Sequence, residues 1–136
     1  MYHMFWHATS FNQPLDKWNV SSVIYMEGMF FGAHSFNQSL NTNTVIRHDG
    51  TTYTAWDVSS VTTMECMFRE AKSFNQPLNS WDVSSVTDMN RMFDEASLFN
   101  QPLDSWNVSS VENMVYMFAS APLFNHPIGS LSLIHI

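Results

Sequence analysis

The chain contains 136 residues, the size of one ordinary domain, and has a formal net charge of −7 with only five Lys and Arg residues. So few cations argue against binding to nucleic acid or to an anionic membrane surface. Charged residues make up 12% and aromatic residues 15% of the chain, which is too apolar for a disordered protein. No run approaches the roughly 18 apolar residues of a membrane-spanning helix, so we expect no membrane insertion by this segment.

One unit recurs along the whole chain. It is clearest at Phe74–Leu98, FNQPLNSWDVSSVTDMNRMFDEASL, and all ten methionines fall at two of its positions. A period of this size is typical of stacked repeats. In chain order the copies span residues 1–10 (partial), 11–35, 36–73 (with an insertion at 42–55), 74–98, 99–123 and 124–136 (partial or a cap). The chain opens and closes inside copies, which indicates a single fragment, expected to be a monomer within a longer array.

The first half of each unit predicts a strand and the second half predicts a short helix. Trp81-Asp82-Val83 alternates apolar and polar residues, as a half-buried strand does. Met89, Met92, Phe93 and Ala96 have the spacing of one helix face. We therefore expect an α/β solenoid with a parallel β-sheet on one side and short helices on the other. The expected strand centres are Trp18–Val20, Trp56–Val58, Trp81–Val83 and Trp106–Val108, with a fifth near Ile128, Leu131, Leu133 and Ile136.

Residues in the same register should form columns through such a stack. The tryptophans, methionines and phenylalanines are expected to form the core, and we interpret them as structural rather than as ligand-stacking residues. A column of asparagines is expected to satisfy backbone groups in the turns, since short amides do this well. Its members are Asn12, Asn37, Asn75, Asn100 and Asn125.

A second polar column is expected on the outer face of the sheet. It contains Asn19, Asp57, Asp82, Asn107 and Ser132, and the first four are candidate contacts for a partner. Neighbouring strands lie about 4.8 Å apart, so Asp57 and Asp82 would be adjacent carboxylates. Such a pair could hold a cation, which makes these two residues weak candidates for a metal site. A solvated polar face is the simpler interpretation.

The insertion Thr42–Ala55 is the only large departure from the repeat before the tail. Asp49-Gly50 is a two-residue hairpin turn signal, and strand-forming residues flank it on both sides. We expect a β-hairpin or ordered loop that leaves the stack. Insertions in repeat proteins often carry recognition, which makes Arg47, His48 and Tyr53 candidate partner contacts. A tolerated surface insertion without a role is an equal alternative.

The sequence contains no motif that indicates catalysis, and we expect neither an enzyme nor a cofactor. Cys66 is the single cysteine and shares no motif with the six histidines. His3 and His7 have metal-ligand spacing for a helix, but no second pair accompanies them. The glycosylation sequons at Asn19, Asn37 and Asn107 arise from the repeat itself.

The unit FNQPL-x-x-W-[DN]-VSSV-x-x-M-x-x-MF-x-x-A resembles the repeat of BspA-like bacterial surface proteins, an outlying branch of the leucine-rich repeats. The likeness spans nearly the whole chain except Thr42–Ala55 and the tail after Pro127. It implies a leucine-rich-repeat-like solenoid on a cell surface or secreted, often in a lipoprotein or wall-anchored protein. It also implies adhesion to host or matrix proteins, and no catalytic residue accompanies it. We therefore expect a non-enzymatic protein-binding module, with a structural spacer as the alternative.

Overall fold

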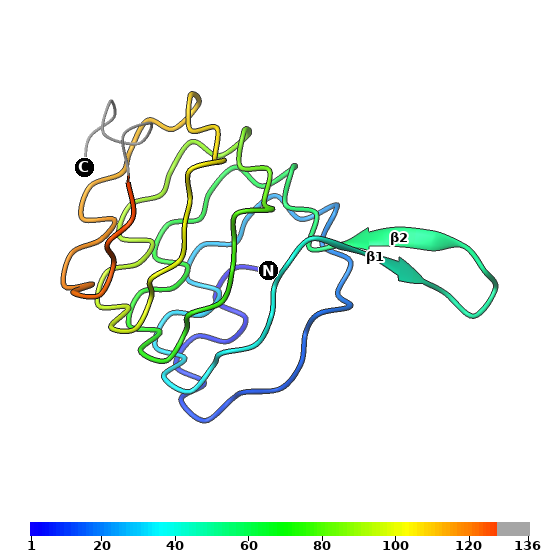
Figure 1. The fold of residues 1–136 in the computed structure, drawn as a ribbon, viewed down its shortest axis with the longest axis horizontal. Helices are drawn as coiled ribbons and strands as arrows, with labels where there is room; N and C mark the ends of the chain where they lie inside the picture. The colour runs from blue at the N-terminus through cyan, green and yellow to red at the C-terminus, as the bar shows by residue number, and fades with distance from the viewer. Residues whose placement is uncertain (128–136) are drawn as a thin grey trace.

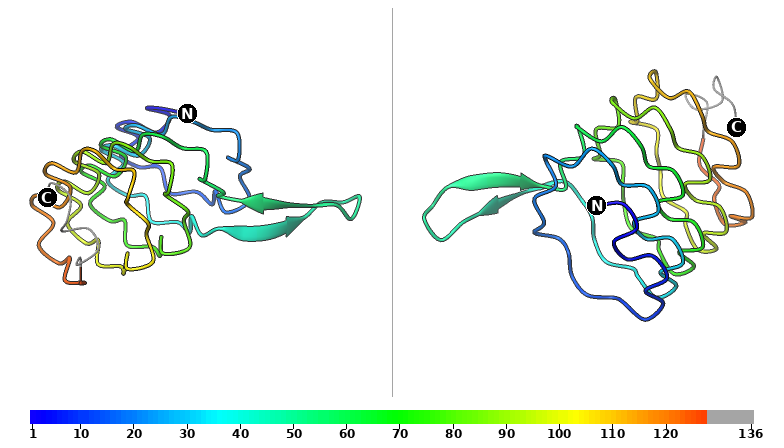
Figure 2. Two further views of the ribbon diagram at one scale, coloured as in Figure 1. Left: turned by 90° about the horizontal axis from the view of Figure 1, so that it is seen from above. Right: turned by 180° about the vertical axis from the view of Figure 1, so that it is seen from behind.

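The computed structural model describes residues 1–127, which form a stack of coils, one from each copy of the repeat (Figure 1). Two strands interrupt this stack: β1 (Asn43–Ile46) and β2 (Thr52–Ala55). They pair antiparallel and project to one side as a hairpin, as the three views in Figures 1 and 2 agree. The expected fifth strand near Ile128, Leu131, Leu133 and Ile136, with Ser132, lies outside the described residues.

The expected α/β architecture is wrong for the part of the chain that the structure describes. Residues 1–127 contain no α-helix, and their only sheet is the antiparallel hairpin β1–β2. None of the four expected strand centres forms a strand. Parallel pairing survives only as isolated bridges at a later repeat position, joining Tyr25 to Thr63, Thr63 to Asp88, and Asp88 to Asn113.

The expected helix is absent because its backbone groups bond to the neighbouring coil. A helix would direct the Phe68 N–H to the carbonyl of Met64, but it donates instead to Met92 in the next coil at 2.9 Å. The intervening N–H groups close tight turns, as when Met67 donates to Met64 at 3.1 Å. Cys66 and Glu70 have left-handed φ angles of 55° and 56°, which interrupt any right-handed helix.

This backbone conformation repeats in every coil. Left-handed residues recur in two columns, at His3, Gly28, Cys66, Arg91 and Tyr116, and at His7, Gly32, Glu70, Glu95 and Ser120. A left-handed residue other than glycine costs roughly 1–2 kcal/mol. The hydrogen bonds from alternate N–H groups to the next coil offset that cost. Each segment that was expected to be a helix is therefore a run of turns laid flat against its neighbour.

The expected strands are absent because their backbone groups also close local turns. The Trp81 N–H donates to Leu78 and the Val86 N–H donates to Val83, at 3.1 and 3.0 Å. These N–H groups are not free to form a ladder with the equivalent residues of the next coil. The apolar side chains Val83 and Val86 still face inward, since both are buried.

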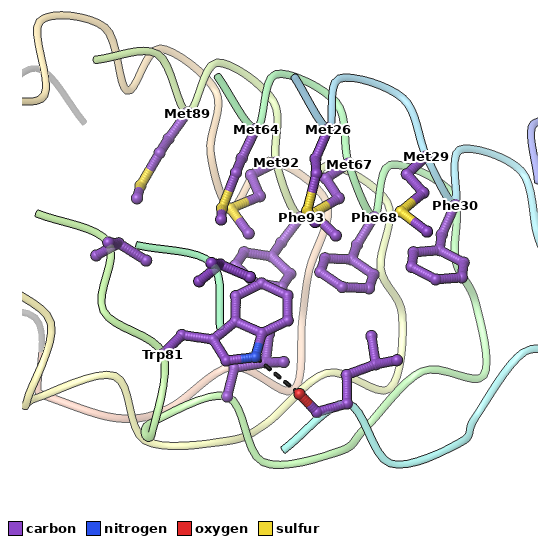
Figure 3. Packing of buried hydrophobic residues seen from close by; sticks show 14 of the residues in the cluster. Met26, Met29, Phe30, Met64, Met67, Phe68, Trp81, Met89, Met92 and Phe93 are labelled. Atoms are coloured by element: carbon purple, nitrogen blue, oxygen red, sulfur yellow. Dashed lines mark hydrogen bonds between the residues drawn. The ribbon is translucent and has the colours of Figure 1, made fainter. Parts of the chain in front are cut away.

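The apolar columns fill the interior of the stack as expected (Figure 3). Phe30, Phe68 and Phe93 lie directly above one another with ring centroids 5.5 and 5.6 Å apart and nearly parallel planes. Trp56 and Trp81 are buried and stack with centroids 6.1 Å apart. The Trp81 indole N–H donates to the carbonyl of Leu40 at 2.8 Å, so this buried polar group is satisfied.

The expected asparagine ladder is confirmed. Asn37 donates its backbone N–H to the side-chain oxygen of Asn12, and Asn75 donates in the same way to Asn37, both at 2.9 Å. The pattern continues through Asn100 to Asn125. The adjacent glutamines strengthen three of these steps, since Gln38, Gln76 and Gln101 each donate to the asparagine of the preceding coil.

Candidate functional site: the projecting hairpin

The insertion forms a hairpin, as expected, but its turn differs from the expected one. The strands pair in the register Asn43 with Ala55 and Ile46 with Thr52. The Arg47 N–H donates to Thr51 and the Gly50 N–H donates back to Arg47, at 2.8 and 3.0 Å. The loop therefore has three residues, with Gly50 in a left-handed conformation at φ 84°. A tight turn followed by a left-handed residue is the common three-residue hairpin loop.

The base of the hairpin is anchored to the first coils. The Tyr53 hydroxyl donates to the carbonyl of Lys17, and the Asn43 amide donates to the carbonyl of Asp16 at 3.1 Å. Val45 and Tyr53 are partly buried against the apolar core. An isolated two-stranded hairpin is only marginally stable in water, so these contacts fix the direction in which the strands project.

The candidate contacts Arg47 and His48 lie at the exposed outer part of this hairpin, and Tyr53 lies nearer its anchored base. The Arg47 guanidinium lies 4.6 Å from the centre of the Tyr53 ring, a cation–π contact. These three residues line a shallow depression of about 630 Å³ together with Lys17, Val45, Ile46 and Asp49. Two residues of this depression were not among the candidate contacts expected from the sequence. Lys17 replaces the Ser80 of another copy, and Ile46 is 73% exposed.

Asp49 shapes the loop and is a fixed negative charge. Its carboxylate accepts hydrogen bonds from the Thr51 hydroxyl and backbone N–H at 2.6 and 2.9 Å. These bonds hold the pKa of Asp49 below its ordinary value. The depression thus contains one engaged carboxylate beside the two cations Lys17 and Arg47.

The side chains of the other candidate contacts are hydrogen-bonded within their own turns. These residues are Asn19, Asp57, Asp82 and Asn107. Each accepts a hydrogen bond from the backbone N–H of the serine two residues later, at 3.0 to 3.1 Å. The Ser84 hydroxyl also donates to Asp82 at 2.6 Å, and the two bonds hold the pKa of Asp82 below its ordinary value. These side chains lie on turns rather than on the face of a sheet.

The weak metal candidates Asp57 and Asp82 are not joined by a third His, Cys, Asp or Glu side chain within residues 1–127. Within residues 1–127, no three His, Cys, Asp or Glu side chains come together in a group that could hold a metal ion. That part of the chain also has no helix that is long and apolar enough to cross a bilayer.

A charged cluster in the second half of the repeat was not expected from the sequence. Asp94 is only 4% exposed, and its Oδ2 lies 2.9 Å from Arg91 and 3.3 Å from Arg69. Arg69 also lies over Phe31, with 5.0 Å to the ring centre. Asp94 occupies the repeat position of Arg69 and Phe31, so this column has a different type of residue in each of these copies. Only that substitution pattern could have indicated an ion pair between coils.

Cys66 borders this cluster and is partly buried. Burial raises the pKa of its thiol, and the nearby Glu65 carboxylate raises it further. A thiol with a raised pKa is a poor nucleophile.

Comparison with known proteins identifies one family. The sequence profile described as "Mycoplasma protein of unknown function, DUF285" matches residues 1–55 and 44–135. No curated protein and no solved structure matches the chain.

Proposed function

We propose that this chain, which belongs to the DUF285 family, is a non-enzymatic cell-surface repeat module that binds another protein. The projecting hairpin carries this proposal, because it is the one part of the described chain that leaves the stack (Figure 2). Its outer residues Ile46, Arg47 and His48 are exposed while its base is anchored. A rigidly anchored, exposed element suits recognition, since little ordering is needed on binding.

Cell-surface placement and a host or matrix protein as partner rest on the likeness of the repeat to BspA-like surface proteins. The low content of cations accords with that role. The stack itself supplies the support. Its asparagines and buried rings form contacts between coils. In this proposal the hairpin therefore provides the specificity for the partner.

A structural spacer is the second candidate function. It is favoured by the coil surface, where polar residues such as Asp82 and Asn107 are engaged in their own turns. A spacer would present the same engaged groups in every coil and would bind nothing. The two candidates differ in whether removal of the hairpin removes a measurable interaction.

The test compares two purified proteins against immobilised extracellular-matrix proteins by surface plasmon resonance. One is the full chain, and the other has Thr42–Ala55 replaced by a single serine. That replacement restores the spacing of the neighbouring copy, where Ser80 alone separates Asn79 from Trp81. Loss of binding in the shortened protein places recognition in the hairpin. Retained binding would move it to the coils, and absence of binding by the full chain would favour the spacer.

A further inference from the structure

The tip of the hairpin contains the one Asp-Gly pair of the chain, since only Asp49 among the aspartates is followed by glycine. At such a pair, the backbone nitrogen of the glycine can attack the side-chain carboxyl carbon of the aspartate. Glycine has no side chain to obstruct this approach. Asp49 and Gly50 are both exposed, so water reaches them. The pair is therefore a place where the chain can modify itself without an enzyme.

The reaction joins the Gly50 nitrogen to the side-chain carboxyl carbon of Asp49. The hydroxyl of the neutral carboxyl group leaves with the N–H proton as water, and the product is a five-membered cyclic imide. Water then reopens the imide at one of its two carbonyl groups. Opening at the main-chain carbonyl gives isoaspartate, in which the main chain passes through the side-chain carbons and is one carbon longer. The two steps release and consume one water molecule and need no other reactant.

The folded hairpin engages both reacting groups. The Gly50 N–H donates to the carbonyl of Arg47 at 3.0 Å, so the attacking nitrogen is held in a hydrogen bond. The Asp49 carboxylate accepts bonds from the hydroxyl and the backbone N–H of Thr51 at 2.6 and 2.9 Å. These bonds hold the pKa of Asp49 below its ordinary value. The neutral carboxyl group, which is the form that loses water, is therefore less populated in the folded loop.

The turns of the coils use the same carboxylate arrangement without the reactive glycine. Asp82 accepts bonds from the hydroxyl and the backbone N–H of Ser84 at 2.6 and 3.0 Å, but the next residue is Val83, whose β-branched side chain obstructs attack by its nitrogen. The hairpin loop differs because Gly50 has a φ of 84°, a conformation that favours glycine. Asp82 is therefore an internal control for Asp49.

We propose that Asp49–Gly50 is a self-modification site, at which conversion to isoaspartate is suppressed by the hydrogen bonds of the folded loop and proceeds when the hairpin opens. Conversion adds one carbon to the main chain of a three-residue loop. The bond between Gly50 and Arg47 would then be lost, and the hairpin would not regain its original shape. The proposal holds whether or not the hairpin binds a partner, so it goes beyond the proposed function.

The test incubates the full chain at mildly acidic pH, in buffer and in guanidinium chloride. Peptide mapping with electron-transfer fragmentation measures isoaspartate at each aspartate. Conversion of Asp49 should be at least about tenfold slower in buffer, because only the opened loop reacts. Asp82 should not convert detectably in either condition. Equal rates of Asp49 conversion in buffer and in denaturant would overturn the proposal.

Two variants isolate the Thr51 hydroxyl. In buffer, Thr51→Val should convert several-fold faster than the parent protein, whereas Thr51→Ser keeps the hydroxyl bond and should convert at the parent rate. All three proteins should convert alike in denaturant, where the loop bonds are absent. A nuclear Overhauser contact between the paired residues Val45 and Tyr53 verifies that each hairpin is folded.

An intact Thr51→Val hairpin that converts no faster than Thr51→Ser would also overturn the proposal. If Thr51→Val instead opens the hairpin, conversion at the denatured rate supports the proposal and a slower rate contradicts it.

Discussion

The polar residue after each tryptophan stabilises a turn. Asp82 and Asn107 both accept the backbone N–H of the serine two residues later. A carboxylate oxygen and an amide oxygen can both accept this bond, which accounts for the presence of Asn19 and Asp57 at the same repeat position. A site that selected a ligand by charge would not tolerate that exchange.

Asp82 should make the free energy of unfolding decrease at acidic pH. Its pKa is lowered in the folded protein by hydrogen bonds from Ser84, so its contribution is present above the ordinary carboxyl pKa and is lost as the pH falls through the lowered pKa. Asp82→Asn should keep the turn and flatten the decline in the free energy of unfolding over that acid range. Asp82→Ala should cost about 1 kcal/mol at neutral pH through lost hydrogen bonds.

Urea unfolding at several pH values measures this effect. The matched control is Asp16→Asn, because the Asp16 side chain accepts no hydrogen bond among the described residues and is exposed. The control should keep the decline of the parent protein. An identical acid decline in the parent and in Asp82→Asn would show that the turn bond does not carry it.

Two kinds of backbone can bury the same set of side chains, and the repeat uses the rarer one. The spacing of Met64, Met67, Phe68 and Ala71 is that of a helix face, and all four are fully buried. Successive turns with a left-handed residue between them place the same side chains inward. They also free alternate N–H groups to bond the next coil, as Phe68 does with Met92.

The stability of Glu95→Gly relative to Glu95→Ala distinguishes these two backbones, because the difference has opposite signs in the two cases. Glu95 has a φ of 59°, a conformation that glycine adopts without steric cost. Relative to Glu95→Ala, the glycine variant should be more stable by about 1 kcal/mol. In a helix interior glycine would instead be less stable than alanine by about 1 kcal/mol.

Thermal unfolding of both variants measures the difference. Gly32 occupies the same position in another coil with a φ of 71°, so the substitution copies a residue that the chain already uses. An alanine variant more stable than the glycine variant would mean that this segment is helical in solution.

The sequence predicted the positions of the side chains better than it predicted the backbone. Register alone placed Phe68 over Phe93 and Asn75 over Asn37, and both contacts exist. The helix and strand predictions failed because periodicity reports which side chains are buried and not where each N–H bonds. Gly28 and Gly32 were the one sequence feature that pointed to left-handed residues in these segments, since glycine is favoured at left-handed positions.

The candidate site was predictable to a similar extent. Thr44, Val45 and Tyr53 are strand-forming residues around a turn signal, so the hairpin and its contacts Arg47 and Tyr53 could be predicted from local sequence. Lys17 could not, because it comes from an earlier coil and is brought to the hairpin by the folded structure, where its carbonyl accepts the Tyr53 hydroxyl.

At the scale of the whole molecule, the stack is held by contacts between nearest neighbours. Alternate backbone N–H groups of each coil donate to carbonyls of the next, as from Cys66 to Asn90 and from Arg91 to Val115. The asparagine ladder runs in the opposite sense, since each later coil donates to the earlier one. Stability in such a protein is approximately a sum of coil terms and interface terms.

The position of a weakened interface between coils should therefore determine how many coils lose stability. Asn12→Ala and Asn75→Ala each remove an acceptor of one backbone N–H and one glutamine amide, worth about 1–2 kcal/mol. Asn12→Ala should loosen only the coils formed by residues 1–35, while Asn75→Ala should weaken the middle of the stack and lower the urea midpoint. Hydrogen exchange resolved by coil measures this. Equal loss of protection in every coil for Asn12→Ala would show that the stack unfolds as one unit.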